Sequence, residues 1–179
     1  MSLINSKGYI SELSFKNKLS RFLWAFIYTI AFRTTPRPMH AWRVFLLRCF
    51  GADIEKSAKV YASARIWAPW NLILKEGAIL GDRVDCYCVA PITIGKKAVV
   101  SQDSFLCAAT HDHRSMTFTL IARPIYFGDG AWIAARAFVG PGVSIGINSV
   151  VGACAVVFKD VPAQSTAIGN PCRILDEAR

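Results

Sequence analysis

Large apolar side chains return at every sixth residue in the second half of the chain. They occupy six successive positions: Phe127, Ile133, Val139, Ile145, Val151 and Val157. The residue four places after each of them is no larger than valine. A period of six fits neither an α-helix, at 3.6 residues per turn, nor a single strand, at two. A β-sandwich would alternate at two with irregular turns, so the pattern instead predicts a β-helix, a coil of short flat faces.

The same frame continues upstream of Phe127. Its large apolar positions are Ile54, Val60, Ile66, Leu74, Leu80, Cys86, Ile94, Val100 and Leu106. Each group of three predicts one turn of a triangular prism. The steps from Ile66 to Leu74 and from Cys86 to Ile94 are eight residues, so one corner of each coil holds two extra residues. We therefore expect an all-β domain over residues 53–179, with regular coils from about Ile54 to the segment 159–162.

Residues 1–52 show a helical pattern and form a separate N-terminal segment in this interpretation. Ser14 is placed to cap a helix that runs to about Phe32, and a second helix is predicted over about 39–49, closed by Gly51. The uninterrupted apolar run of 22–32 is too short to span a bilayer, which needs about 20 residues.

Charge is concentrated in this first segment. The chain of 179 residues carries a net charge of +9, which favours an anionic partner. Residues 1–52 hold eight of the basic residues against Glu12 alone. Basic residues beside Trp and Phe indicate contact with an anionic membrane surface; the alternative is that the helices pack against the prism or a neighbouring subunit. Nucleic acid is not expected, because the basic residues flank an apolar face.

The six cysteines follow no spacing typical of secreted domains, which predicts a cytoplasmic protein, with the inner face of the plasma membrane as a peripheral location. Cys86 and Cys88 form only a C-x-C pair, so no metal site is expected. Cys86 and Cys154 are predicted to be buried small residues of the coil.

The regular rhythm stops after Leu106 and resumes at Phe127. Residues 107–126 are therefore predicted to leave the prism as a loop, and a long excursion from a rigid scaffold usually carries function. This loop contains His111 and His113, two of the three histidines. A neutral imidazole is suited to take a proton from an attacking hydroxyl near neutral pH.

With these features the chain resembles the hexapeptide-repeat acyltransferases, and among them the colanic-acid-type O-acetyltransferases of bacterial exopolysaccharide synthesis. The resemblance rests on Trp42-Arg43, Phe50-Gly51-Ala52, Pro69-Trp70, Tyr87, Pro91 to Gly95, Ser101-Gln102, Thr110 to His113, Gly128 to Ala134, Val139 to Val143 and Gly169-Asn170-Pro171. It implies a left-handed parallel β-helix, contrary to the usual handedness of parallel crossovers. It also implies a homotrimer with active sites shared between two subunits.

The resemblance assigns roles to individual residues. His111, in the Thr110-His111 pair, is implied as the catalytic base, with His113 as a rival or an acceptor contact. Tyr87 is implied near the acceptor site. Asp85, which with Tyr87 flanks the inward Cys86, is expected either to orient His111, to bind sugar hydroxyls or to be a solvated surface carboxylate. For coenzyme A, the implied positions are Trp132, Ala134, Ala135, Gly152, Ala153, Lys159 and Arg173, the last two beside the nucleotide phosphates.

The predicted function is acetyl-CoA-dependent O-acetylation of a sugar in an exopolysaccharide or O-antigen precursor, free or lipid-linked, by direct transfer. A small sugar, an amino-sugar or an amino acid remains open as the acceptor. Two other classes compete. A zinc-dependent carbonic anhydrase on the same prism would need three His ligands, and His40 lies far from the loop in sequence. A non-catalytic β-helix scaffold would leave the His-bearing loop without a purpose.

Overall fold

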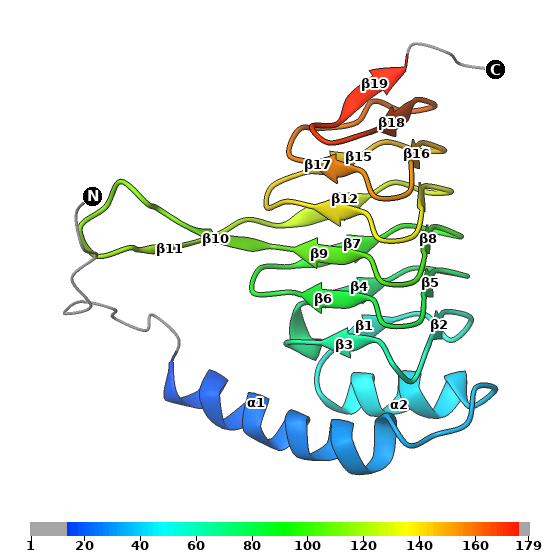
Figure 1. The fold of residues 1–179 in the computed structure, drawn as a ribbon. Helices are drawn as coiled ribbons and strands as arrows, with labels where there is room; N and C mark the ends of the chain where they lie inside the picture. Colours follow the sequence, from blue (N-terminus) through cyan, green and yellow to red (C-terminus); the bar gives the residue numbers. More distant parts are fainter. Residues whose placement is uncertain (1–13, 176–179) are drawn as a thin grey trace.

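The computed structural model describes residues 14–175, and it forms the predicted left-handed parallel β-helix with helices at its N-terminal end (Figure 1). Three faces make up the prism. Face A consists of β1 (Asp53–Ile54), β4 (Leu72–Leu74), β7 (Ile92–Ile94), β12 (Ile125–Phe127) and β15 (Ser144–Ile145). Face B consists of β2 (Lys59–Val60), β5 (Ile79–Leu80), β8 (Val99–Val100), β13 (Trp132–Ile133), β16 (Val150–Val151), β18 (Thr166–Ile168) and β19 (Arg173–Leu175). Face C consists of β3 (Arg65–Ile66), β6 (Asp85–Tyr87), β9 (Phe105–Cys107), β14 (Phe138–Val139) and β17 (Val156–Val157).

The period of six arises because each face holds one inward side chain and each corner one small one. Strands pair in register from coil to coil, as where Leu74 meets Ile94 and Leu80 meets Val100. These inward side chains are almost completely buried and form one continuous core. Corner glycines permit the tight stacking: a Cβ on Gly146 would lie 2.3 Å from the backbone nitrogen of Ala163. The longer step after Ile66 contains the short 3₁₀ helix η2 (Pro69–Asn71), which includes Trp70.

The predicted N-terminal helices are confirmed. Helix α1 (Phe15–Ile27) is capped by Ser14, whose Oγ accepts a hydrogen bond from the Asn17 backbone at 3.2 Å, and it continues as the π-helix η1 (Tyr28–Phe32). Helix α2 (His40–Cys49) ends before Gly51, which adopts φ +86°. None of the helices within the described residues is long and apolar enough to cross a membrane.

The helices pack against the first coils of the prism, as one of the two interpretations expected. The Trp24 indole donates a hydrogen bond of 2.7 Å to the carbonyl of Ile66. Arg43 is completely buried and donates to the carbonyls of Val60 and Arg37. His40 contacts the Val60 carbonyl through Nδ1 at 2.9 Å. The helices therefore cover the end of the core that the first coil would leave open.

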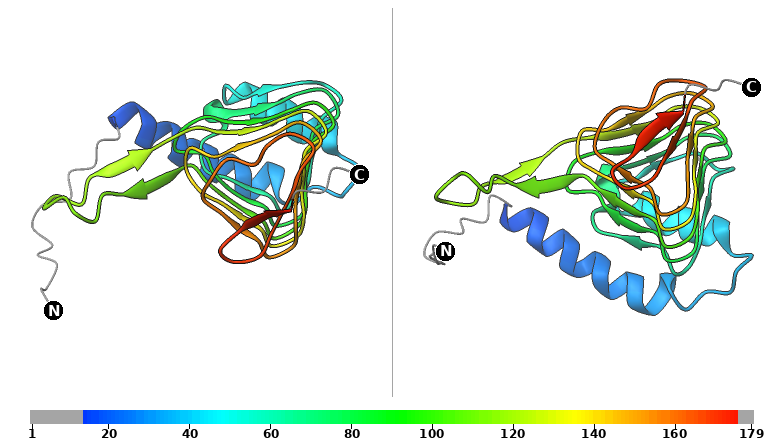
Figure 2. Two further views of the ribbon diagram at one scale, coloured as in Figure 1. Left: turned by 90° about the horizontal axis from the view of Figure 1, so that it is seen from above. Right: turned by 45° about the horizontal axis from the view of Figure 1, so that its top comes forward.

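The excursion is a β-hairpin rather than an irregular loop. Strands β10 (Ala109–His111) and β11 (Leu120–Ala122) pair antiparallel, with His111 opposite Leu120. Cys107 still belongs to β9, and Ile125 already belongs to β12, so residues 108–124 leave the prism. They leave at the corner between faces C and A. Figure 2 shows the hairpin and the N-terminal end of α1 projecting to the same side of the triangular outline.

Two sequence expectations about the coils are wrong. The coils do not end at 159–162, because Val161 bridges to Ile145 and β18 extends face B by pairing with β16. Strand β19 then folds back antiparallel on β18. Cys86 is buried as predicted, but Cys154 is exposed, because it occupies a corner turn with φ +59°. Its side chain therefore lies outside the core.

Candidate active site

His111 is held by the turn that joins the two strands of its own hairpin. Its Nδ1 lies 2.9 Å from the backbone carbonyl oxygen of Phe118. The Phe118 ring stacks on the imidazole with a centroid separation of 4.7 Å and an interplanar angle of 10°. Phe118 adopts φ +49°, an uncommon conformation for a bulky residue, within the turn that joins the two strands. The hydrogen bond and the stacking contact with Phe118 both orient the ring of His111.

This geometry decides which nitrogen of the neutral ring is basic. A carbonyl oxygen only accepts hydrogen bonds, so Nδ1 must carry the proton and donate it to Phe118. Nε2 then holds the lone pair of the neutral imidazole. A backbone carbonyl thus performs the orienting function that sequence analysis considered for Asp85.

The neighbouring residues of the hairpin stabilise its tip. The Asp112 backbone donates to the Thr119 carbonyl at 2.8 Å, and the Asp112 carboxylate accepts from the Arg114 backbone at 2.9 Å. His113 is exposed in the turn that follows His111. The acceptor role implied for His113 stays a prediction.

Tyr87 lies at the root of the hairpin. It stands in register with Cys107, and its carbonyl accepts a hydrogen bond of 3.1 Å from Ala108, the first residue to leave the prism. His111 is three residues further along an extended strand, about 10 Å outward at ~3.3 Å per residue. The base candidate is therefore carried away from face C while Tyr87 remains on it.

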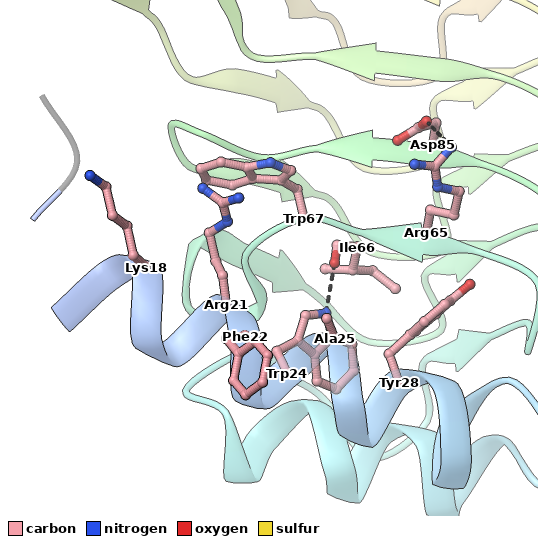
Figure 3. A pocket seen from close by; sticks show the side chains of 10 residues that line it. All are labelled: Lys18, Arg21, Phe22, Trp24, Ala25, Tyr28, Arg65, Ile66, Trp67 and Asp85. Carbon is pink, nitrogen blue, oxygen red and sulfur yellow. Dashed lines mark hydrogen bonds and ion pairs between the residues drawn. The ribbon is translucent and has the colours of Figure 1, made fainter. Parts of the chain in front are cut away.

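Asp85 belongs to a cavity that sequence analysis did not find. Its carboxylate pairs with Arg65 at 3.3 Å, and both line a cavity of about 480 Å³ between α1 and face C (Figure 3). Helix α1 contributes Lys18 and Arg21, and the Arg21 guanidinium lies 4.0 Å from the centroid of the Trp67 ring. The cavity is thus lined by aromatic surface, three cations and one carboxylate.

The six-residue repeat of the sequence contained a signal for part of this cavity. Arg65 and Trp67 stand one coil before Asp85 and Tyr87 in the same outward positions, as their register shows. The contribution of α1 had no such signal. Tyr28 lies in the cavity wall, and burial raises the pKa of its phenol above the ordinary value, so it is neutral at physiological pH.

The residues implied for coenzyme A fall into two groups. Five of them surround the corner between faces B and C: Trp132, Ala134, Ala135, Gly152 and Ala153. The Trp132 side chain is 49 % exposed, and its indole donates to Ser101 Oγ at 2.9 Å. Lys159 instead follows β17 at the corner between faces C and A, and Arg173 lies on β19. The structure therefore brings five of the seven together on one corner.

One chain does not unite the base candidate with this corner. The hairpin leaves at the corner between faces C and A, whereas Trp132 and Ala153 lie at the corner between faces B and C. The whole width of face C separates them. A site that uses both must receive them from different chains.

Within residues 14–175, no three His, Cys, Asp or Glu side chains are grouped so that they could hold a metal ion. His40 belongs to α2, which lies at one end of the prism, away from the hairpin of β10 and β11 that carries the other two histidines (Figure 1). The arrangement therefore gives no support to the zinc-dependent alternative.

Comparison with known proteins gives the family. No family model matches the chain. It is 44% identical over 155 residues to "Putative colanic acid biosynthesis acetyltransferase WcaF" of Escherichia coli (strain K12), an alignment that covers 87% of this chain and 85% of that protein. It is 36% identical over 123 residues to the galactoside O-acetyltransferase of Escherichia coli, which covers 67% of this chain and 55% of that one.

A solved structure shares the fold. The hexapeptide-repeat acetyltransferase VCA0836 of Vibrio cholerae, complexed with acetyl-CoA, superimposes with a TM-score of 0.83 at 24% identity, covering 95% of this chain and 93% of that one. Fold and sequence together define the class: the chain belongs to the hexapeptide-repeat acyltransferase family and is an acetyltransferase. Within that family its likeness is to the colanic acid biosynthesis type.

Proposed function

We propose that the protein transfers the acetyl group of acetyl-CoA to a hydroxyl of a sugar in a bacterial exopolysaccharide or O-antigen precursor, with His111 as general base. The observation that carries the proposal is the hydrogen bond from His111 Nδ1 to the Phe118 carbonyl, which makes Nε2 the basic atom. The named relatives support the reaction class, since one is a galactoside O-acetyltransferase and a fold neighbour is complexed with acetyl-CoA.

The chemistry requires little beyond this base. His111 Nε2 removes the proton of the acceptor hydroxyl as its oxygen attacks the thioester carbonyl carbon. The C–S bond then breaks, and the imidazolium returns the proton to the leaving thiolate sulfur, so His111 is neutral again. General base catalysis of this kind contributes roughly 10²–10⁴-fold to a rate.

The donor lies, in this proposal, at the corner between faces B and C of a neighbouring chain in a trimer. Small residues there, such as Ala153, let the pantetheine arm approach the backbone. Arg173 supplies a cation for a phosphate, and Lys159, at the corner between faces C and A, supplies another from the chain that carries the hairpin. A surface suited to subunit contact lies between the two corners. It is an aromatic row on face C, formed by Trp67, Tyr87, Phe105, Phe138 and Phe158, with successive ring centroids 5.3–6.5 Å apart. Phe105 and Phe158 are exposed and the other three are half-buried, and aromatic residues are enriched at interaction surfaces.

The acceptor lies, in this proposal, on the side of Tyr87 and the cavity below it. Asp85 offers acceptor oxygens to sugar hydroxyls, and Trp67 offers an aromatic surface for a sugar ring. The cations Lys18 and Arg21 are suited to a phosphate on the acceptor, as in an activated or lipid-linked sugar. Neither residue pairs with a carboxylate of the described chain.

The test is acetyl transfer from labelled acetyl-CoA to a panel of acceptors. The panel contains free sugars, nucleotide-linked sugars, lipid-linked oligosaccharides, amino-sugars and amino acids. We expect a hydroxylamine-sensitive ester on a sugar, formed fastest on a diphosphate-linked acceptor. Transfer only to an amine would contradict O-acetylation, and absence of acetyl-CoA binding by calorimetry would favour a non-catalytic scaffold.

A further inference from the structure

Helix α1 exposes a second apolar surface that the fold does not use. The inner side of α1 and η1 packs on the prism through Trp24 and Phe32, which are almost completely buried. The outer side carries apolar residues at helical spacing, a set that we call the outer helical face: Phe15, Leu19, Phe22, Leu23, Phe26 and Ile30 of the first helical segment, with Trp42 and Phe45 of α2. Phe15 is 80 % exposed and Phe22 is 71 % exposed.

The two helices contribute to one continuous surface. The Trp42 indole donates a hydrogen bond of 2.9 Å to the carbonyl of Ala31, which follows Ile30 in the π-helix. The rings of Trp42 and Phe45 lie 5.6 Å apart. The first helical segment thus carries apolar residues on two opposite sides, and only the inner side is covered by the prism within the described residues.

Charge indicates what covers it. Residues 14–50 contain seven basic residues and no acidic one, whereas residues 51–175 contain twelve basic and nine acidic residues. Arg43 is buried and Arg37 pairs with Asp82 of the prism, but Lys16 and Lys18 of α1 and Arg33 at the end of η1 are exposed on the helical segment that carries the outer helical face. A second copy of this strongly basic segment would be repelled, whereas anionic phosphate headgroups would be attracted.

We propose that the outer helical face docks on an anionic membrane surface, with α1 lying in the interface. Aromatic side chains at the headgroup level and flanking cations are the composition that such helices share. The helices are too short to span, as shown above, so the contact is peripheral. Both helices lie at one end of the prism, so docking leaves the coils and the hairpin outside the bilayer (Figure 1).

Docking also bears on the proposed function: it would bring a membrane-embedded acceptor to the cavity, and this step alone rests on the proposed function. The cavity between α1 and face C has Lys18 and Arg21 in its wall, on the helix that would lie in the interface. A phosphate-linked acceptor embedded in the same membrane would reach this cavity without leaving the lipid surface. The docking itself does not depend on catalysis.

The experiment is flotation of the full chain with vesicles of neutral phosphatidylcholine and with vesicles that also contain anionic phosphatidylglycerol. We expect binding to the anionic vesicles to exceed binding to the neutral ones by more than about tenfold, because basic residues near the surface are attracted to anionic headgroups. The double variant Phe15→Ser with Phe26→Ser, which touches neither the cavity nor the candidate active site, is expected to lower the partition coefficient by about tenfold or more. The matched control is Ile147→Ser with Ile168→Ser, two exposed apolar residues on the prism, with binding unchanged.

Circular dichroism and sedimentation velocity of the same proteins complete the test. Retained helicity in the Phe15 and Phe26 variant with loss of flotation supports docking through the outer helical face. Failure of the unaltered chain to float with anionic vesicles overturns it. Normal flotation of the Phe15 and Phe26 variant overturns it as well. So does a smaller oligomer for this variant than for the unaltered chain in sedimentation velocity, because the outer helical face would then be a contact between copies. Normal acetyl transfer to a free sugar by the non-floating variant separates this proposal from the proposed function.

Discussion

His111→Ala is expected to lower kcat by about 10²–10⁴-fold, the scale for losing a general base. The acceptor hydroxyl would then attack while it still carries its proton. The KM for acetyl-CoA is expected to stay within about threefold, because the donor corner is on a different part of the prism. The fold should be preserved, since the His111 side chain belongs to the hairpin and not to the core.

The matched control for this prediction is His113→Ala. His113 is exposed two residues further along the same hairpin, so its loss reports any general disturbance of the hairpin. Steady-state kinetics with the best acceptor of the panel provide the comparison. Near-normal turnover of the His111 variant, with a large loss for the His113 variant, would transfer the role of base to His113.

Ala153→Trp is expected to lower kcat/KM for acetyl-CoA by about 100-fold or more. Ala153 is exposed in the corner turn after β16, so an indole there projects into solvent and into the groove proposed for the pantetheine arm. Exposed substitutions of this kind usually change stability by less than about 0.5 kcal/mol. The loss should therefore appear as weaker donor binding and not as unfolding.

Ala163→Trp is the control for the second prediction. Ala163 is also exposed in a late turn of the coils, but this turn follows Val161, which pairs on face A, and leads to β18 on face B. Calorimetric titration with acetyl-CoA and thermal melting should be measured on both variants. Equal loss of donor affinity in both, or none in the Ala153 variant, would place the donor elsewhere.

The sequence was sufficient for the architecture of the prism because its signal is local and repeated. In every coil the inward position must hold an apolar side chain that stacks on the coil before it, as Val139 and Ile145 do, so a single period describes all these positions. Cys154 was misplaced for a related reason. It occupies a turn position with positive φ, where the period gives no information about the direction of the side chain.

The end of the coils was also misjudged. Pro162 and the loss of the six-residue rhythm resembled a stop signal, yet Val161 still pairs with Ile145 and β18 still pairs with β16. A strand that is held by the coil beneath it does not need the full repeat in its own sequence.

The candidate site was predictable only in part. The break in the rhythm located the segment that carries His111, but nothing in the pattern signalled that Ala109–His111 pairs with Leu120–Ala122. The contact between His111 and the Phe118 carbonyl depends on that pairing and uses a backbone atom, which every residue type provides. The cavity was missed because Arg21 and Trp67 are brought together by the packing of α1 on face C.

Mixed assemblies test most directly whether the active site is shared between chains. His111→Ala and Ala153→Trp chains, each nearly inactive alone, are to be co-expressed with different tags. Capture through one tag with detection of the other confirms that mixed assemblies form, and activity is measured before any such separation. In a threefold ring assembled at random from equal amounts, about one quarter of the contacts join an intact hairpin to an intact donor corner. The account predicts that the unfractionated mixture regains about that fraction of wild-type activity, and activity that stays at the level of the separate variants would contradict it.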